Sequence, residues 1–208
     1  MSDYLVSLCI SYLIGSFPTA YLVVKKTSQL DIRTAGSGNV GGRNALEVTG
    51  KKSIGVLVVA IDVLKGIISV TLAAMVFSDR SAAISAAMAG VVLGHCYPVW
   101  LRFKGGRGLA TAAGVMIVTG WIWVVLWLAL YFISSKATED VHLSSVIALV
   151  ATPIVAWFLP DLTSAAIFLK YMTEQEFFTA ALLPLAVSLS RHIGPLKEFY
   201  EQKNSKSR

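Results

Sequence analysis

The sequence predicts an all-helical protein that crosses a membrane several times. Of its 208 residues, 55% are hydrophobic and only 14% are charged, whereas an average soluble domain carries roughly 25% charged residues. The hydrophobic residues form long runs instead of the alternating pattern of a half-buried strand. Because a helix needs roughly 20 residues to cross a hydrocarbon core of about 30 Å, several of these runs are long enough to span a bilayer.

The first three predicted spans are residues 4–24, 53–77 and 81–101. The first run contains Gly15 and Pro18, is longer than a signal peptide and is followed by no small-residue cleavage site. We therefore expect it to remain in the protein as a span.

The apolar run at residues 109–133 is predicted to form two short spans instead of one. Its first part is rich in small residues and its second part in bulky aromatic residues, and the change falls at Thr119 and Gly120. Two more spans are predicted at residues 144–159 and 177–190, with an interfacial helix between them at residues 161–176. The expected architecture is a polytopic membrane protein of about seven transmembrane helices.

Basic residues predict the orientation, because the side of a membrane that holds the excess Lys and Arg of short loops is cytoplasmic. With seven spans, every strongly basic loop and the tail fall on one side, and the other side keeps only Arg80 and Lys170. This places the N-terminus outside and the C-terminus in the cytoplasm. We find no internal repeat or linker, so residues 1–208 are expected to form one membrane-embedded domain.

A glycine-rich loop follows the first span. Residues 36–44 hold four glycines within seven positions, which lets the backbone turn its N–H groups towards one point. Ser37, Asn39 and Asn44 add short polar side chains at the same place. Such a loop favours an oxyanion as its ligand, and the alternative is an ordinary flexible loop.

A second loop places basic residues directly before a helix. Residues 104–108 read Lys-Gly-Gly-Arg-Gly, so two cations, unpaired N–H groups and the positive end of a helix converge. This favours a phosphate group, although the spacing differs from that of the nucleotide P-loop. The alternative is that Lys104 and Arg107 only anchor the chain at the membrane surface. Such anchoring also explains the net charge of +6, so no nucleic-acid partner is expected.

Two charged residues, Asp62 and Lys65, lie three positions apart inside the second span and share a helix face. A charge within a span is a functional candidate. A mutual ion pair that ties this helix to the motif loops is the interpretation we favour, and both stay open here. His95, Tyr97 and Pro98 are expected to shape the entry to the second loop.

Several short motifs, in order, resemble the bacterial acyl-phosphate glycerol-3-phosphate acyltransferase family, PlsY. The similarity covers most of the chain to about residue 120 and is thinner beyond it. The motifs are Ile-Gly-Ser at 14–16, Gly-Ser-Gly-Asn-Val-Gly at 36–41, Gly-Lys-Lys at 50–52, Asp-x-x-Lys-Gly at 62–66, Gly-His-x-Tyr-Pro-Val at 94–99, Phe-Lys-Gly-Gly-Arg-Gly-Leu-Ala-Thr at 103–111, Val-His-Leu-Ser-Ser at 141–145 and Arg-His at 191–192. The family has seven spans with the N-terminus outside, which agrees with the count from charge.

The resemblance implies transfer of a fatty acyl group from acyl phosphate to the 1-hydroxyl of glycerol 3-phosphate. The product, lysophosphatidic acid, would enter phospholipid synthesis at the inner face of the bacterial cytoplasmic membrane. We expect no cofactor and no metal ion, and a functional partner enzyme that makes the acyl phosphate. None of the three histidines is followed five positions later by aspartate, which excludes the His-x4-Asp mechanism of other membrane acyltransferases.

The resemblance also implies roles for individual residues. Ser37 and Asn39 are expected to orient the reacting groups. His192 is expected to take or relay the proton of the acceptor hydroxyl or to hydrogen-bond it, and the leaving phosphate is an alternative proton acceptor. The expected substrate-binding residues are Gly36, Gly38, Arg43, Asn44, Lys104, Gly105, Gly106, Arg107, Gly108, Thr111 and Ser144.

Departures from the family pattern fall on the acceptor side. The chain has Arg43 and Glu47 where the family usually shows Thr and Arg, His142 where Ser is common, and Gly194 and Pro195 in place of a motif with Asn. Arg43, one helical turn earlier, is placed to reach the acceptor phosphate with Glu47 as its partner. One alternative is a divergent paralogue with another acceptor. The other is a transporter of an anionic metabolite, which two glycine loops at one membrane face disfavour.

Overall fold

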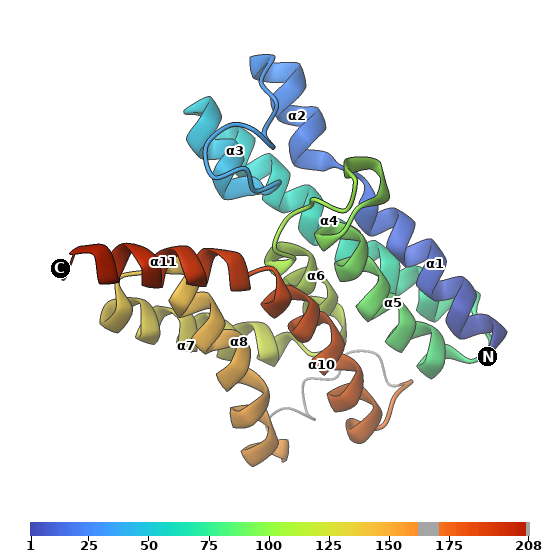
Figure 1. Cartoon of the computed structure of the whole chain (residues 1–208). Coiled ribbons are helices and arrows are strands. Elements are labelled where there is room, and N and C mark those ends of the chain that lie inside the picture. Colours follow the sequence, from blue (N-terminus) through green and yellow to red (C-terminus); the bar gives the residue numbers. More distant parts are fainter. Residues whose placement is uncertain (162–170, 207–208) are drawn as a thin grey trace.

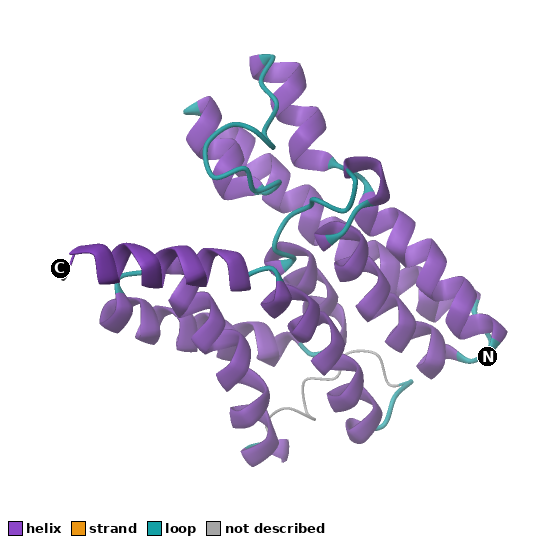
Figure 2. Ribbon diagram, viewed as in Figure 1, coloured by secondary structure: helices purple, strands orange, loops and turns teal. Residues whose placement is uncertain are grey.

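The computed structural model describes residues 1–161 and 171–206 (Figure 1). Within these residues the chain is helical and contains no strand (Figure 2), which confirms the predicted fold class. Five segments are long and apolar enough to cross a membrane, or six if α10 and α11 form one bent span. The seven-span count and the orientation stay predictions. The interfacial helix expected at 161–176 falls mostly on residues 162–170, which lie outside the described part.

The first predicted span consists of two helices, α1 (Ser2–Ser16) and α2 (Thr19–Ser28). They are separated by Phe17 and Pro18. Proline has no N–H group and its ring clashes with the preceding turn, so a regular helix does not continue through it. The break frees backbone groups of the last turn of α1 in the interior of the protein, and other side chains have to satisfy them.

The centre of the bundle is formed by α4 (Lys52–Val76) and α5 (Arg80–Cys96), with α1 packed along α5 (Figure 1). Small residues allow the backbones to approach closely, as is common between membrane helices. A Cβ on Gly90 would lie 2.7 Å from the carbonyl oxygen of Leu8 on α1. A Cβ on Gly94 would lie 2.8 Å from the backbone nitrogen of Ser16.

The predicted turn within the 109–133 run is confirmed as a helix break at Gly120. α6 (Leu109–Thr119) ends there and α7 (Trp121–Thr138) begins. The ring of Phe177 occupies the space beside Gly120, where a Cβ would lie 3.0 Å from its Cε1 atom. At 1.5 Å per residue, the 11 residues of α6 rise only about 16 Å.

The remaining helices complete two buried clusters. The larger cluster joins α4, α5, α6 and α10 and includes the buried Trp123 of α7. The smaller one lies in the lobe formed by α2, α3, the connecting loop and the first half of α4 (Figure 1). The elements not yet given are α3 (Gly42–Thr49), a 3-10 turn η1 (Val99–Leu101), α8 (Val141–Phe158), α10 (Glu174–Ser190) and α11 (Ile193–Lys206). The two glycine-rich loops join these parts.

Candidate active site

The first glycine loop is folded around the side chain of Asn44. This amide is 1% exposed. Its oxygen accepts from the backbone N–H of Ser37 at 3.0 Å, and its nitrogen donates to the carbonyls of Ala35 at 3.1 Å and Asn39 at 2.9 Å. Gly36 and Gly38 have φ angles of 59° and 68°, which the turn requires. Asn44 therefore holds the loop from inside.

In the second loop, two of the backbone N–H groups expected to bind phosphate are already used. Gly105 donates to the carbonyl of Cys96 at 3.2 Å and Gly106 to that of His95 at 3.1 Å. Gly108, with φ of 82°, precedes the first residue of α6, whose first-turn N–H groups have no partner within the helix. The donors available at this loop therefore lie at the start of α6, later than the Gly105 and Gly106 that the sequence indicates.

Arg191, at the break between α10 and α11, donates hydrogen bonds to the second loop. Its Nε donates to the carbonyl of Gly106 at 3.2 Å and its Nη2 to that of Gly105 at 3.1 Å. Its guanidinium lies 5.3 Å from the ring centre of Tyr97. The sequence motif includes this arginine but gives it no role, because its partners are 85 and 86 positions away.

A cavity of about 320 Å³ lies where the two loops meet α8 and α11. Four residues predicted from the sequence line it, namely Ser37, Gly38, Asn39 and Arg107. The residues that line it without having been assigned to the site are His142, Ser190, Arg191, Gly194, Pro195 and Glu198. The predicted residues outside the lining are Gly36, Arg43, Asn44, Lys104, Gly105, Gly106, Gly108, Thr111, Ser144 and His192.

The cavity carries a small excess of positive charge, because Arg107 and Arg191 line it together with one carboxylate, that of Glu198. Burial lowers the pKa of the half-buried Arg107, and the positive charges of Arg43 and Arg191 lower it further. The carboxylates of Glu198 and Glu47 oppose this effect. Because like charges gathered in a partly buried cavity repel one another, a bound dianion would relieve the repulsion. The site is therefore electrostatically prepared for a phosphate.

The ring of His192 is completely buried, and its Nδ1 lies 2.9 Å from the carbonyl oxygen of Ser188. Because a carbonyl only accepts, Nδ1 carries the hydrogen and Nε2 keeps its lone pair. Among the described residues Nε2 has no hydrogen-bond partner, and neither have the hydroxyls of Ser188 and Thr111. Buried polar atoms are normally paired, so each of these three atoms is open to a further polar partner.

His142 lies beside this group. Its ring centre is 6.2 Å from that of His192, and it lines the cavity with Arg107. It begins α8, where the carboxylate of Asp140 accepts its backbone N–H at 2.8 Å. In the sequence the only signal was that His stands where Ser is common in the similar family.

Three residues that the sequence predicts to bind substrate, Ser144, Arg43 and Lys104, lie outside the cavity lining. The Ser144 hydroxyl donates to the carbonyl of Asp140 at 2.6 Å and pairs with the Thr138 hydroxyl at 2.7 Å, so it braces the turn between α7 and α8. The Arg43 Nε lies 2.9 Å from the Glu47 carboxylate at the surface. Lys104 is exposed.

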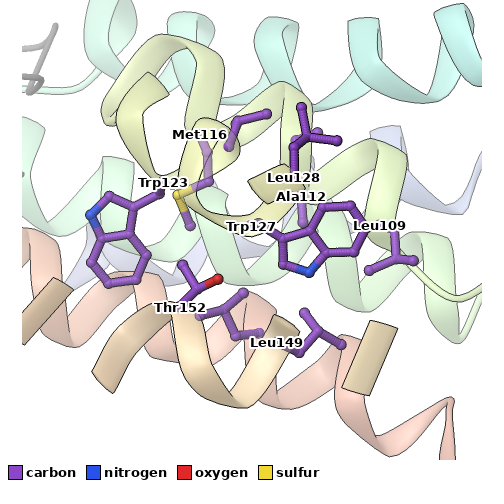
Figure 3. Close-up of a pocket in the computed structure, with 11 residues that line it drawn as sticks. Leu109, Ala112, Met116, Trp123, Trp127, Leu128, Leu149 and Thr152 are labelled. Atoms are coloured by element: carbon purple, nitrogen blue, oxygen red, sulfur yellow. The ribbon is translucent and has the colours of Figure 1, made fainter. Parts of the chain in front are cut away.

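An apolar pocket of about 90 Å³ lies close to the polar cavity, between α6, α7, α8 and α10 (Figure 3). Figure 3 shows Trp123 at one side of the lining residues and Leu109 at the other, with the indole ring of Trp127 between them. Leu109 is only two residues after Arg107, which lines the polar cavity. Within residues 1–161 and 171–206, no cluster of three or more His, Cys, Asp or Glu residues is arranged to hold a metal.

Comparison with known proteins places this geometry in a family. A family model described as glycerol-3-phosphate acyltransferase matches residues 5–201. The glycerol-3-phosphate acyltransferase of Syntrophotalea carbinolica is 37% identical over 173 residues, which are 82% of this chain and 88% of that protein. The one from Endomicrobium trichonymphae is 35% identical over 199 residues, which are 96% and 93% of the two chains.

Two solved structures are similar to this chain. The crystal structure of PlsY, an integral membrane glycerol 3-phosphate acyltransferase, in its glycerol 3-phosphate form has a TM-score of 0.74 and 28% identity. Its lysophosphatidic acid form has a TM-score of 0.76 and 27% identity. Both cover 96% of this chain and 92% of the other.

Proposed function

The chain belongs to the glycerol-3-phosphate acyltransferase family, and from this premise we propose that it transfers a fatty acyl group from acyl phosphate to the 1-hydroxyl of glycerol 3-phosphate. The product is lysophosphatidic acid for phospholipid synthesis. It is an integral membrane protein, and we place it in the bacterial cytoplasmic membrane. Its functional partner would be the enzyme that makes the acyl phosphate.

One observation carries the proposal, namely that a cationic cavity and an apolar pocket are joined by three consecutive residues. Arg107 lines the first and Leu109 the second. On α8, His142 lines the cationic cavity, and Leu149, two helical turns later, lines the apolar pocket. An acyl phosphate has the matching chemistry, a dianionic head on a hydrocarbon chain.

The acyl phosphate is an activated mixed anhydride, so the protein chiefly has to position two anions and stabilise the phosphate that leaves. Arg107 is placed to balance the charge on that phosphate. Ser37 and Asn39, which line the same cavity, are placed to orient the acceptor. Asn44 would support them by fixing the loop instead of contacting a substrate itself.

In the reaction, the 1-hydroxyl oxygen of the acceptor bonds to the acyl carbon while the bond from that carbon to the phosphate oxygen breaks. The hydroxyl proton goes either to His192 or to the leaving phosphate. The hydrogen bond from Nδ1–H to Ser188 leaves the Nε2 lone pair of His192 free for the first route, although this ring is buried and lies outside the cavity lining. The second route needs no protein base.

The test is to supply purified protein with palmitoyl phosphate and labelled glycerol 3-phosphate, without coenzyme A, and to look for labelled lysophosphatidic acid. Arg107→Ala should be inactive, whereas Arg102→Ala, at an exposed arginine of the same loop, should be active. Phosphate release with another polyol phosphate and none with glycerol 3-phosphate would indicate a paralogue with a different acceptor. No acyl transfer to any acceptor would reject the proposal.

A further inference from the structure

A buried ionic network lies behind the active-site loops and outside the lining of the substrate cavity. The Lys65 ammonium is 2.8 Å from the Asp62 carboxylate, and these side chains are 5% and 2% exposed as residues. The His95 Nδ1 atom of α5 lies 3.6 Å from the same carboxylate oxygen. Three titratable groups of two helices therefore meet around one oxygen, with the two opposite charges balanced.

The network reaches the break between α1 and α2. The Lys65 ammonium donates to the carbonyl of Phe17 at 2.6 Å. This carbonyl belongs to the break before Pro18, and it also accepts the backbone N–H of Thr19 at 2.9 Å. The hydroxyls of Ser16 and Thr19 line the same small space as Lys65 and have no partner within the described residues. The break is thus held by a charged side chain of α4.

The network also reaches the second glycine loop through His95. The carbonyl of His95 accepts the N–H of Gly106 at 3.1 Å. The imidazole ring fills the space beside Gly106, where a Cβ would lie 3.0 Å from Cε1. The same Cβ would lie 2.7 Å from the carbonyl oxygen of Val40, at the end of the first glycine loop. Gly106 is therefore fitted between His95 and the first loop.

Through these contacts, both glycine loops pack against the network of Asp62, Lys65 and His95. We infer that Asp62, Lys65 and His95 are positioning residues that set the distance between Arg107 on one loop and Ser37 and Asn39 on the other. They do not line the substrate cavity. The inference rests on the proposed function for its kinetic consequence, but the loop geometry that it explains does not depend on that function.

The test compares His95→Asn with His95→Leu in the full-length protein. Asn keeps a donor near the place of Nδ1, whereas Leu removes it and keeps the apolar volume. Because misplacement on the order of 1 Å costs about a hundredfold in rate, we expect His95→Leu to lower kcat at least roughly tenfold. The KM of each substrate should change less than about threefold, since the lost stabilisation lies in the transition state. His95→Asn should recover a large part of kcat.

Hydrogen exchange gives a second measurement that is independent of activity. The Gly106 amide donates to the His95 carbonyl, so the peptide that covers residues 102–109 should exchange faster in His95→Leu than in the natural protein or in His95→Asn. Asp62→Asn, which keeps the side-chain size and removes the charge, should show the same faster exchange. It serves as the second variant where His95→Leu is too unstable to purify.

The outcomes separate the two proposals. If the natural chain forms no lysophosphatidic acid, the proposed function fails, and loop exchange still tests the network. If the natural chain is active and His95→Leu and His95→Asn have equal kcat and equal loop exchange, the network does not position the loops. A fall in melting temperature without any change in kcat or exchange would assign it to stability alone, and would equally overturn the inference.

Discussion

Arg191 donates through its Nε to the carbonyl oxygen of Gly106 at 3.2 Å, so the break that ends α10 is fixed to the loop that precedes α6. The two residues are 85 positions apart. One side chain thereby ties the cavity residues at the α10–α11 break to the loop that carries Arg107.

The first prediction is that Arg191→Lys lowers kcat about tenfold or more. Lysine has one ammonium in place of a fork and cannot donate to the carbonyls of Gly105 and Gly106 in the same geometry. A hydrogen bond that involves a charged group contributes about 1.5–3 kcal/mol. Steady-state kinetics check the result, and the control is Arg102→Lys, at an exposed arginine of the loop that Arg191 contacts. An unchanged kcat in Arg191→Lys would show that these hydrogen bonds are dispensable.

The second prediction concerns Gly106→Ala. Its Cβ would overlap the His95 ring and lie 2.7 Å from the Val40 carbonyl. Overpacking of this kind typically costs about 1–3 kcal/mol, so both the melting temperature and the activity should fall. Gly50→Asn is the control, because its Cβ meets open space and Asn tolerates the positive φ of that position. Equal stability of Gly106→Ala and the natural protein would contradict the close fit.

The third prediction is that filling the apolar pocket shortens the preferred acyl chain. Ala113→Phe places a ring in the space between α6 and α7. Each buried CH2 group contributes about 0.8 kcal/mol, so losing two of them should lower kcat/KM for palmitoyl phosphate roughly tenfold and leave octanoyl phosphate nearly unaffected. Ile117→Phe, at an exposed residue of the same helix that does not line the pocket, is the control. An equal loss for both donors would place the acyl chain elsewhere.

The fourth prediction addresses the acceptor. If Arg43 holds the phosphate of glycerol 3-phosphate, Arg43→Ala should raise the KM for that substrate about tenfold, which corresponds to about 1.4 kcal/mol. The KM for acyl phosphate should stay the same. Glu47→Gln removes the surface ion pair with Arg43, and such a pair contributes little to stability. The acceptor KM should therefore fall or stay unchanged, because Arg43 is no longer paired with a carboxylate. A silent Arg43→Ala would exclude this arginine from acceptor binding.

The fifth prediction tests the orientation. In a background without Cys9 and Cys96, a single cysteine at Lys51 should react with a membrane-impermeant thiol reagent only from the cytoplasmic side. One at Ser78 should react only from outside. Both positions are exposed, so access decides the outcome. Labelling of both from the same side would remove the predicted arrangement of the first three spans.

The sequence allowed the helical class and the break at Gly120 to be predicted, because hydrophobic runs and a change from small to aromatic residues are local signals. Pro18 is visible in the sequence as a proline, but the hydrophobic run around it predicts one interrupted span. The carbonyl of Phe17 at this break accepts a hydrogen bond from Lys65, 48 positions later. Such a contact has no signal in the neighbouring residues.

The same distinction applies to the site. Ser37, Asn39 and Arg107 were predicted from dense glycine and basic motifs, and they line one cavity. Motif membership did not distinguish them from Asn44, whose amide points into its own loop. A glycine-rich motif contains both the residues that face a ligand and those that hold the loop, and only the fold separates them. Arg191 shows the converse, since its importance comes from partners on another element.

The length of α6 has a consequence for where the reacting groups lie. A rise of about 16 Å is roughly half of a hydrocarbon core, so this helix cannot reach from one membrane surface to the other. Its end at Gly120 is sealed by the ring of Phe177, and its start follows the loop that carries Arg107. When the chain is inserted in a bilayer, at least one end of α6 therefore lies within the thickness of the hydrocarbon core.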